Sequence, residues 1–189
     1  MQITESFEVH SEPDAAWKLF QDIAELAQCL PGAELKEERG GGEYAGSVVA
    51  KFGPITLTFE GDAKVTADQA AHTGTVDAKG ADKRGGSSGS VKVDYRIEPS
   101  PAGTRVNVDA DVVLRGQAAQ FGRTGLIQEM AHRIVGEFVD CIEAKLAAET
   151  AEDAAQIQAG ALKGFSLFLS SLVAPIARLF RRIFRRSGH

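Results

Sequence analysis

Alternating apolar and polar residues mark the start of the chain as a β-strand. Apolar side chains occupy every second position from Ile3 to Val9, apart from Glu5, which is the period of a strand with one buried face. Residues 11–14 then supply a helix N-cap, an early proline and a first-turn acid. The pattern predicts two short helices, over about residues 13–20 and 23–29, and Leu30-Pro31-Gly32 ends the second.

Residues 33–115 are predicted as six strands that are divided by turns rich in glycine and proline. The alternation is clearest over residues 55–65, 91–97 and 106–114. The glycine-rich run Gly85–Gly89 lacks the Lys-Ser/Thr ending and the following helix of a phosphate-binding loop, so we expect a hairpin turn there. Such short connections favour an antiparallel meander with one face covered.

After Gln117 the apolar spacing changes to that of a helix. Its apolar stripe predicts one long helix from about Phe121 to Ala148. A strand, two short helices, six strands and a long helix is the order of an α+β helix-grip fold, in which a curved seven-stranded antiparallel sheet wraps the terminal helix. Residues 1–148 form the predicted domain, and residues 149–162 suit a linker or a loosely held helical extension.

The last segment, residues 163–189, differs from the rest in composition. Its 14 uncharged residues from Gly164 to Ala177 are interrupted by Pro175, and a spanning helix needs about 20. Apolar residues recur instead at steps of three and four opposite arginines, the pattern of a helix lying in the headgroup plane. The predicted membrane-binding residues are Phe165, Phe168, Leu169, Leu172, Ile176, Arg178, Leu179, Phe180, Arg181, Arg182, Ile183, Phe184, Arg185 and Arg186. The alternatives are a helix docked on the domain or on a partner protein, and a nucleic-acid contact.

Charge separates this segment from the domain. The chain has a net charge of -5, but the segment after Asp153 carries +6, which leaves -11 for residues 1–153. An acidic domain argues against nucleic acid as its partner, whereas a basic amphipathic tail suits an anionic leaflet. Composition is otherwise close to the globular average, with 43% hydrophobic and 25% charged residues.

The two cysteines, Cys29 and Cys141, have no CxxC spacing. The residues after Met1 lack the apolar core of a signal peptide, so we expect a cytoplasmic protein. In a reducing compartment buried free thiols are more frequent than a disulfide, and free thiols are therefore predicted.

No catalytic constellation is present in the sequence. The four histidines, His10, His72, His132 and His189, lie far apart and have no cysteine companion, so no metal site is expected. Lys83-Arg84 could contact an anionic partner, although two exposed cations are usually solvated surface.

A sheet curled around one helix can instead leave an apolar interior that suits a lipophilic ligand. The predicted walls of that interior are Phe7, Trp17, Phe20, Leu30, Phe52, Leu57, Phe59, Leu114, Phe121, Leu126, Met130 and Ile134. The alternative for each is an ordinary place in the packed core.

Several motifs resemble the CoxG family of carbon monoxide dehydrogenase subunits, within the START-like (SRPBCC) superfamily. They are Trp17-Lys18-Leu19-Phe20-Gln21-Asp22, Cys29-Leu30-Pro31-Gly32, Lys51-Phe52-Gly53-Pro54-Ile55 with Phe59-Glu60-Gly61, and Gln120-Phe121-Gly122-Arg123. The resemblance covers about residues 1–148 and implies the same helix-grip fold.

The resemblance also implies a non-catalytic accessory to a molybdenum-containing carbon monoxide dehydrogenase or a related molybdenum hydroxylase. Such a protein would bind a quinone, menaquinone or ubiquinone, or another lipid, with no metal or covalent cofactor. It would attach to the inner face of the cytoplasmic membrane and pass electrons to the quinone pool. Two alternatives stay open: a tether for the dehydrogenase without a carrier role, and a START-like enzyme such as a cyclase.

Overall fold

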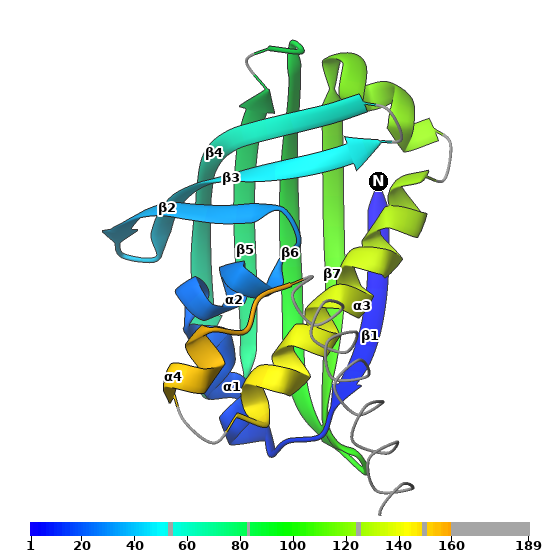
Figure 1. The fold of residues 1–189 in the computed structure, drawn as a ribbon. Helices are drawn as coiled ribbons and strands as arrows, with labels where there is room; N and C mark the ends of the chain where they lie inside the picture. The colour runs from blue at the N-terminus through cyan, green and yellow to red at the C-terminus, as the bar shows by residue number, and fades with distance from the viewer. Residues whose placement is uncertain (53–54, 83, 124–125, 149–150, 160–189) are drawn as a thin grey trace, which may run out of the picture. The chain divides into compact units, whose positions relative to one another are not determined.

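The computed structural model describes residues 1–52, 55–82, 84–123, 126–148 and 151–159 (Figure 1). These residues form one unit, Met1–Ala159. The elements are β1 (Gln2–Val9), α1 (Pro13–Gln21), α2 (Ile23–Cys29), β2 (Ala33–Gly40), β3 (Glu43–Phe52), β4 (Ile55–Asp68), β5 (Thr73–Asp82), β6 (Ser87–Ser100), β7 (Gly103–Arg115), the 3-10 helix η1 (Gly116–Arg123), α3 (Leu126–Leu146) and α4 (Ala151–Ala155).

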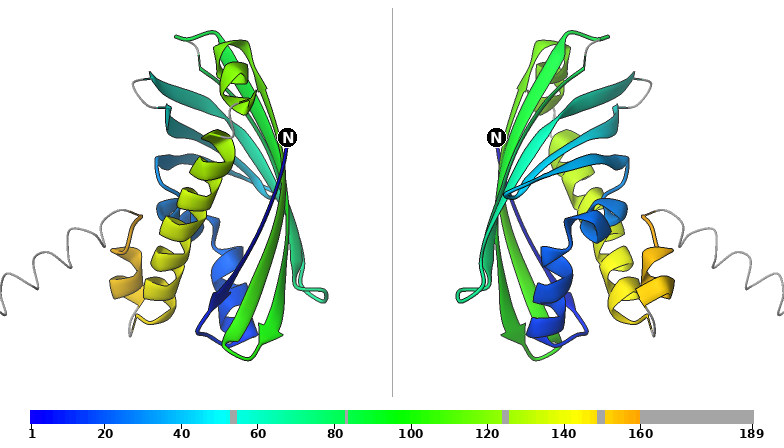
Figure 2. Two further views of the ribbon diagram at one scale, coloured as in Figure 1. Left: turned by 90° about the vertical axis from the view of Figure 1, so that its right-hand side faces the viewer. Right: turned by 90° about the vertical axis from the view of Figure 1, so that its left-hand side faces the viewer.

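Seven strands in the described residues form one antiparallel sheet, in the order β1-β7-β6-β5-β4-β3-β2. The sheet is curved, and α1, α2 and α3 lie on its concave side (Figure 2). The predicted α+β helix-grip class is therefore confirmed. The glycine-rich run Gly85–Gly89 begins in a hairpin turn, as the sequence predicts, and continues into β6, because β5 and β6 pair directly from Asp82 and Ser87 onwards.

A row of glycines crosses the sheet where it bends. The strand register pairs Gly46 with Gly61, Gly61 with Gly80, and Gly80 with Gly89, so the four lie side by side on β3 to β6. A Cβ atom on Gly61 would lie 1.9 Å from the Lys79 carbonyl oxygen, so the backbones approach too closely for any side chain. Beside this row β4 turns, and β2 and β3 cross the direction of β5 to β7 (Figure 1).

The close approach at Gly61 gives a direct test of the bend. Gly61→Ala should lower the free energy of unfolding by about 1–3 kcal/mol, because the added methyl group meets backbone rather than a movable side chain. Gly136→Ala on α3 is the control, since a Cβ there meets nothing within 4 Å, and it should raise stability by about 0.5–1 kcal/mol. Chemical denaturation measures both, and equal effects would contradict the bend.

A disulfide joins Cys29 at the end of α2 to Cys141 in α3. Both residues are fully buried, and their Cα atoms are 5.4 Å apart, within the range that a disulfide spans. The prediction of free thiols is therefore wrong. It rested on the expected compartment, whereas the packing of α2 against α3 places the two side chains face to face.

Lys145 reinforces the same junction from within the core. Its ammonium group is fully buried, forms an ion pair with Glu25, and donates hydrogen bonds to Gln28 Oε1 at 3.1 Å and to the Ala154 carbonyl at 2.7 Å. Three acceptors match the three donors of the ammonium, so the buried charge is fully satisfied. One lysine thus holds α2, α3 and α4 together.

The predicted linker, residues 149–162, carries helix α4. In its described part, residues 151–159, the Ala159 amide donates to the Gln28 carbonyl at 2.9 Å, and Ile157 packs against the core. Residues 160–189 lie outside the described residues, and with them every tail residue that the sequence predicts to bind a membrane.

The long helix begins later than predicted. Residues from Phe121 were expected to be α-helical, but Gly116–Arg123 form a 3-10 helix and α3 begins at Leu126. Gly116 opens this stretch with a backbone φ of 68°, and Gly122 further along disfavours α-helix. The result is a break in direction between β7 and α3.

The disulfide should dominate the stability of the helical end. It closes a loop with a sequence separation of 112 residues, so Cys29→Ala/Cys141→Ala should lower the free energy of unfolding by about 2–4 kcal/mol. Urea denaturation of the oxidised chain and the variant measures the difference, which should shrink when a dithiol reductant is added. Two thiols that alkylate in unreduced, denatured protein would contradict the bond.

Candidate ligand-binding interior

Eight of the twelve predicted wall residues fall into two clusters, and the first cluster is a closed aromatic core. Phe20 contacts Tyr95 and Phe138 with ring centroids 5.5 and 6.1 Å apart, and Phe7 meets Phe138 edge-on at 6.1 Å. Trp17 is buried beside them and stacks on His72 at 5.0 Å. Phe7, Trp17 and Phe20 are thus packed together between the short helices, the sheet and the end of α3.

The second cluster lies between the sheet and the start of α3. Its buried members are Leu57, Ala118 and Ile127. Of these three, only Leu57 is a predicted wall residue, and four further predicted wall residues pack against the cluster and are partly buried: Phe59, Leu114, Phe121 and Met130. Phe59 lies across the glycine row, with Cβ 3.4 Å from the Cβ position of Gly80, so its ring fills space that side chains there would take.

Beside the second cluster the concave face is open to solvent. The register places Val48, Ala50, Ile55, Leu57 and Phe59 on one face of the β3–β4 hairpin. Within the described residues, Val48 and Ile55 remain 46% and 38% exposed, although Leu57 on the same face is buried. Leu30 and Ile134, both predicted wall residues, are likewise 42% and 37% exposed. Large aliphatic side chains therefore form the rim of an incompletely covered interior.

Two predicted wall residues cannot be placed in this way. Phe52 ends β3 and Leu126 begins α3, but the side chains of both lie outside the described residues.

A hollow of about 490 Å³ adjoins this rim. It lies between α2, the start of β2 and the carboxyl-terminal segment, and Leu30, Leu35 and Ala159 are among the residues that line it. Gly32 is required in this region, because its φ is 78° and a Cβ there would lie 2.5 Å from the Val49 carbonyl oxygen. The Leu30-Pro31-Gly32 turn therefore fixes α2 against β3.

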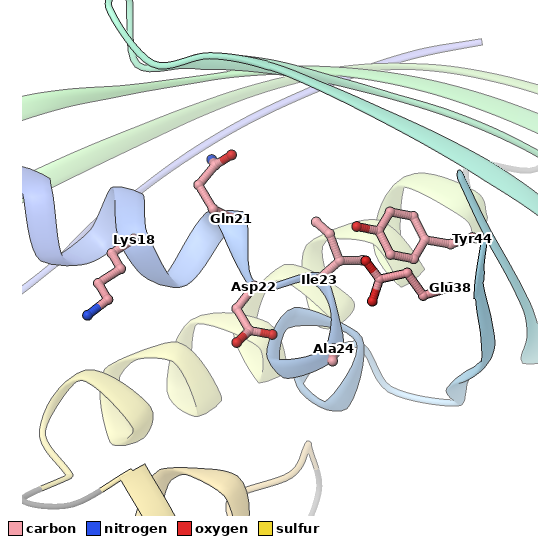
Figure 3. A pocket seen from close by; sticks show the side chains of 7 residues that line it. All are labelled: Lys18, Gln21, Asp22, Ile23, Ala24, Glu38 and Tyr44. Atoms are coloured by element: carbon pink, nitrogen blue, oxygen red, sulfur yellow. The ribbon is translucent and has the colours of Figure 1, made fainter. Parts of the chain in front are cut away.

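A second hollow, of about 340 Å³, is more polar. It lies between the α1–α2 junction and β2–β3, and its lining includes Lys18, Gln21, Asp22, Glu38 and Tyr44 (Figure 3). Partial burial, with the carboxylates of Glu38 and Asp22, raises the pKa of Tyr44 above its usual value. The negative charges therefore act together at this hydroxyl.

Tyr95 is an unusual member of the aromatic core. Its side chain is only 7% exposed, and its Oη has no hydrogen-bond partner among the described residues. The ring lies directly over Gly74, where a Cβ would come within 2.3 Å of Oη. Burial raises the pKa of Tyr95, and the Gln21 side chain offsets part of that rise, because it lies near enough to stabilise the ionised oxygen although the geometry is not that of a good hydrogen bond. A buried hydroxyl with so weak a partner is costly, so the interior contains a poorly satisfied polar group.

The described residues hold no group of three or more His, Cys, Asp or Glu side chains that could bind a metal ion. Of the histidines, His10 lies 2.9 Å from Glu143 and His132 lies 3.5 Å from Glu5, both near the surface. His189 lies outside the described residues, as does Lys83 of the Lys83-Arg84 pair.

Sequence reasoning missed several residues of the open face. Val48 and Ala50 alternate with Val49 and Lys51, but a run of apolar residues there hides which face is inward. Pairing Val48 with Phe59 across the β3–β4 turn would have revealed them, because both then share the face of Leu57. Tyr95 was recognised only as a strand residue, since nothing in the sequence shows an unpaired hydroxyl.

Comparison with known proteins identifies the family to which the chain belongs. The CoxG family model, which describes a carbon monoxide dehydrogenase subunit, matches residues 6–147. The chain belongs to this family. The match spans both apolar clusters and ends with α3, and family membership associates the chain with a carbon monoxide dehydrogenase. No curated protein sequence matches the chain.

Solved structures show the same fold at low sequence identity. A conserved protein from Geobacillus kaustophilus has a TM-score of 0.69 at 16% identity, over 78% of this chain and 95% of its own. A protein from Thermus thermophilus has 0.58 at 16%, over 79% and 100%. A Mycobacterium smegmatis protein has 0.53 at 18%, over 79% and 92%. These likenesses establish the START-like fold alone.

No helix in the described part of this CoxG-family chain is long and apolar enough to span a membrane.

The buried hydroxyl of Tyr95 predicts a distinctive pH dependence. Because its folded pKa lies above the unfolded value of about 10, the stability linked to Tyr95 is fully present below pH 10 and is lost as pH rises further. Tyr95→Phe should leave stability at pH 7 unchanged or higher by up to about 1 kcal/mol, and should reduce the loss above pH 10. Urea midpoints at about pH 7 and 10.5 measure this. A large loss of stability at pH 7 would mean that the hydroxyl has a partner.

Proposed function

We propose that this protein is a non-catalytic carrier of a lipophilic ligand, a quinone such as menaquinone or ubiquinone or another lipid. It docks on the inner face of the cytoplasmic membrane and links a molybdenum-type carbon monoxide dehydrogenase to the membrane quinone pool. The observation that carries the proposal is the open apolar face beside β3 and β4, in a chain that belongs to the CoxG family.

The physical basis is the exposed aliphatic rim. Four aliphatic side chains of this rim are partly exposed to water in the described structure: Val48, Ile55, Leu30 and Ile134. A ligand that covers them gains free energy, because apolar surface of both the protein and the ligand is removed from water. Each methylene group buried contributes about 0.8 kcal/mol, and an isoprenoid chain offers many. Shape and apolarity, rather than a reactive group, are what such a site needs.

A quinone also has carbonyl oxygens that accept hydrogen bonds. Tyr95 supplies a buried hydroxyl that makes no hydrogen bond of good geometry among the described residues, and its nearest polar neighbour, Gln21, also lines the polar hollow. Because Tyr95 belongs to the aromatic core, a ligand oxygen that relieves the cost of its burial has to enter beyond the open rim. This supports a ligand with a polar head group and an apolar chain.

Attachment to the membrane is proposed from the sequence of the tail. Phe165 to Arg186 combine an apolar stripe with arginines, and each cation near an anionic leaflet contributes about 1 kcal/mol. The segment therefore suits reversible adsorption, which a carrier that leaves and returns to the bilayer requires.

A tether is the second candidate function. Here the body grips the dehydrogenase, the tail holds the membrane, and the apolar face is incidental. Family membership favours both candidates equally, so the distinction lies in whether the interior is used.

Ligand content separates the two candidates. Full-length protein purified without detergent should release an isoprenoid quinone or another lipid on organic extraction, detected by mass spectrometry. Ala50→Phe places a ring on the face of Leu57 and should reduce ligand uptake several-fold, whereas Thr66→Phe, at an exposed position on the opposite face of β4, should not. Both variants should unfold near the wild-type denaturant concentration.

The result that sinks the carrier proposal is clear. If protein with its tail intact carries no lipid and takes up no added quinone, the interior is packed core. If Ala50→Phe blocks uptake but electron transfer from the dehydrogenase to quinone continues unchanged, the tether is correct.

A further inference from the structure

Four neighbouring segments at one end of the domain lack acidic residues although the domain is strongly acidic. The described segments 44–52, 55–59, 84–91 and 112–121 contain no Asp or Glu, but they contain Lys51, Arg84 and Arg115. Antiparallel topology brings these segments to one end of the sheet, where β3, β5 and β7 finish and β4 and β6 begin. We call this the basic end.

The cations of the basic end differ from those elsewhere on the sheet. Over the rest of the sheet most lysines and arginines pair with carboxylates, as Arg39 does with Asp62 at 2.8 Å and Arg105 with Glu8 at 2.8 Å, although no ion pair forms at Lys79 among the described residues. Among the residues that the structure describes, Lys51, Arg84 and Arg115 form no ion pair, and all three are exposed. Asp82 adjoins them but is buried, and its carboxylate accepts the Arg84 and Gly85 amides. The three exposed cations outnumber this one buried carboxylate, so the net charge of these described residues is positive.

Apolar side chains are exposed at the same end. Val49 and Val113 project from the outer face next to Lys51 and Arg115, and Ile55 lies on the inner face. The inner-face residue belongs to the rim of the open interior. Cations, aliphatic side chains and the mouth of the interior therefore share one end of the molecule.

We propose that the basic end is a membrane-contact surface of the domain itself, separate from the C-terminal tail, and that it turns the open interior toward an anionic bilayer. Lys51, Arg84 and Arg115 meet lipid phosphates, and Val49, Ile55 and Val113 enter the headgroup region. The part of this inference that concerns the ligand rests on the proposed function, whereas the contact between the basic end and the bilayer does not. It gives the ligand a direct path between bilayer and interior.

A lipid surface fits this end better than an acidic protein does. The cations are spread over three strand ends and alternate with aliphatic side chains, which a fluid headgroup layer accommodates without a matching shape. An acidic protein surface would leave the valines and Ile55 against charged groups, at a desolvation cost. The acidic remainder of the domain is repelled by the same leaflet and so fixes the orientation.

Hydrogen exchange on the full-length chain tests the contact segment by segment. Vesicles of phosphatidylcholine with phosphatidylglycerol should slow amide exchange in residues 44–52, 55–59 and 84–91 at low salt, and pure phosphatidylcholine vesicles should not. Lys51→Glu/Arg115→Glu should lose this protection. Lys18→Glu/Arg96→Glu changes the net charge equally at exposed positions outside the basic end, and should keep it.

The tail is a built-in control, because it stays unchanged in all variants. If anionic vesicles bind the protein but leave these three segments as exchangeable as in solution, the tail alone makes contact and the inference is wrong. Equal loss of protection in both double variants would also overturn it, since net charge and not position would then matter. Protection by a dehydrogenase but not by vesicles would assign the surface to a protein.

Ligand content of the same samples keeps this inference apart from the proposed function. Protein that carries lipid without protection of the basic end would leave the carrier proposal standing and remove the contact. Protection of the basic end in protein that takes up no lipid into its interior would leave the contact standing and remove the carrier proposal.

Discussion

The arrangement of the interior depends on the close backbone approach at Gly61. Where the Lys79 carbonyl occupies the space of a side chain, β4 can turn away from the direction of β5 and carry β2 and β3 with it. The turned hairpin presents Val48 and Ile55 on the concave side, beyond the cover that the second apolar cluster gives Leu57. Without the glycine row the sheet would lie flatter, and the concave face would not open to solvent beside β3 and β4.

The opposite end of the domain is built for rigidity. There Lys145, the Cys29–Cys141 disulfide and the aromatic contacts of Phe20 fix the short helices to α3 and to the sheet. A domain with one tightly held end and one open end can admit a ligand without loosening its core. The distribution of stability thus follows the distribution of proposed function.

The sequence alone predicts the fold well, because strands and helices have different apolar periods. Residues 55–65 alternate so regularly that β4 could be assigned from them, and the order of elements led to the helix-grip class. The start of α3 was misplaced because Phe121 continues an apolar spacing that glycines interrupt. The disulfide was missed because a pairing across 112 residues depends on how two helices pack.

The candidate site was predicted less completely. Phe59 and Met130 could be chosen as large apolar residues, but apolarity does not distinguish a wall from packed core, and Trp17 proved to be stacked on His72. Val48 and Ile55 are candidate site residues because they are exposed. Their exposure can be recognised only from the structure, in which the helices leave part of the bent sheet uncovered. The basic end needs topology as well, because its segments are far apart in the sequence.

The covalent link between α2 and α3 also limits how two copies of the chain can associate. Helix-grip proteins could in principle exchange their terminal helix, with each copy inserting it into the sheet of the other, as in domain swapping. Here Cys141 of α3 is bonded to Cys29 of α2 in the same chain, and the strands β2 to β7 lie between the two cysteines in the sequence. A swapped dimer can form only after this bond is broken. Each molecule therefore keeps its own α3 while the bond is intact.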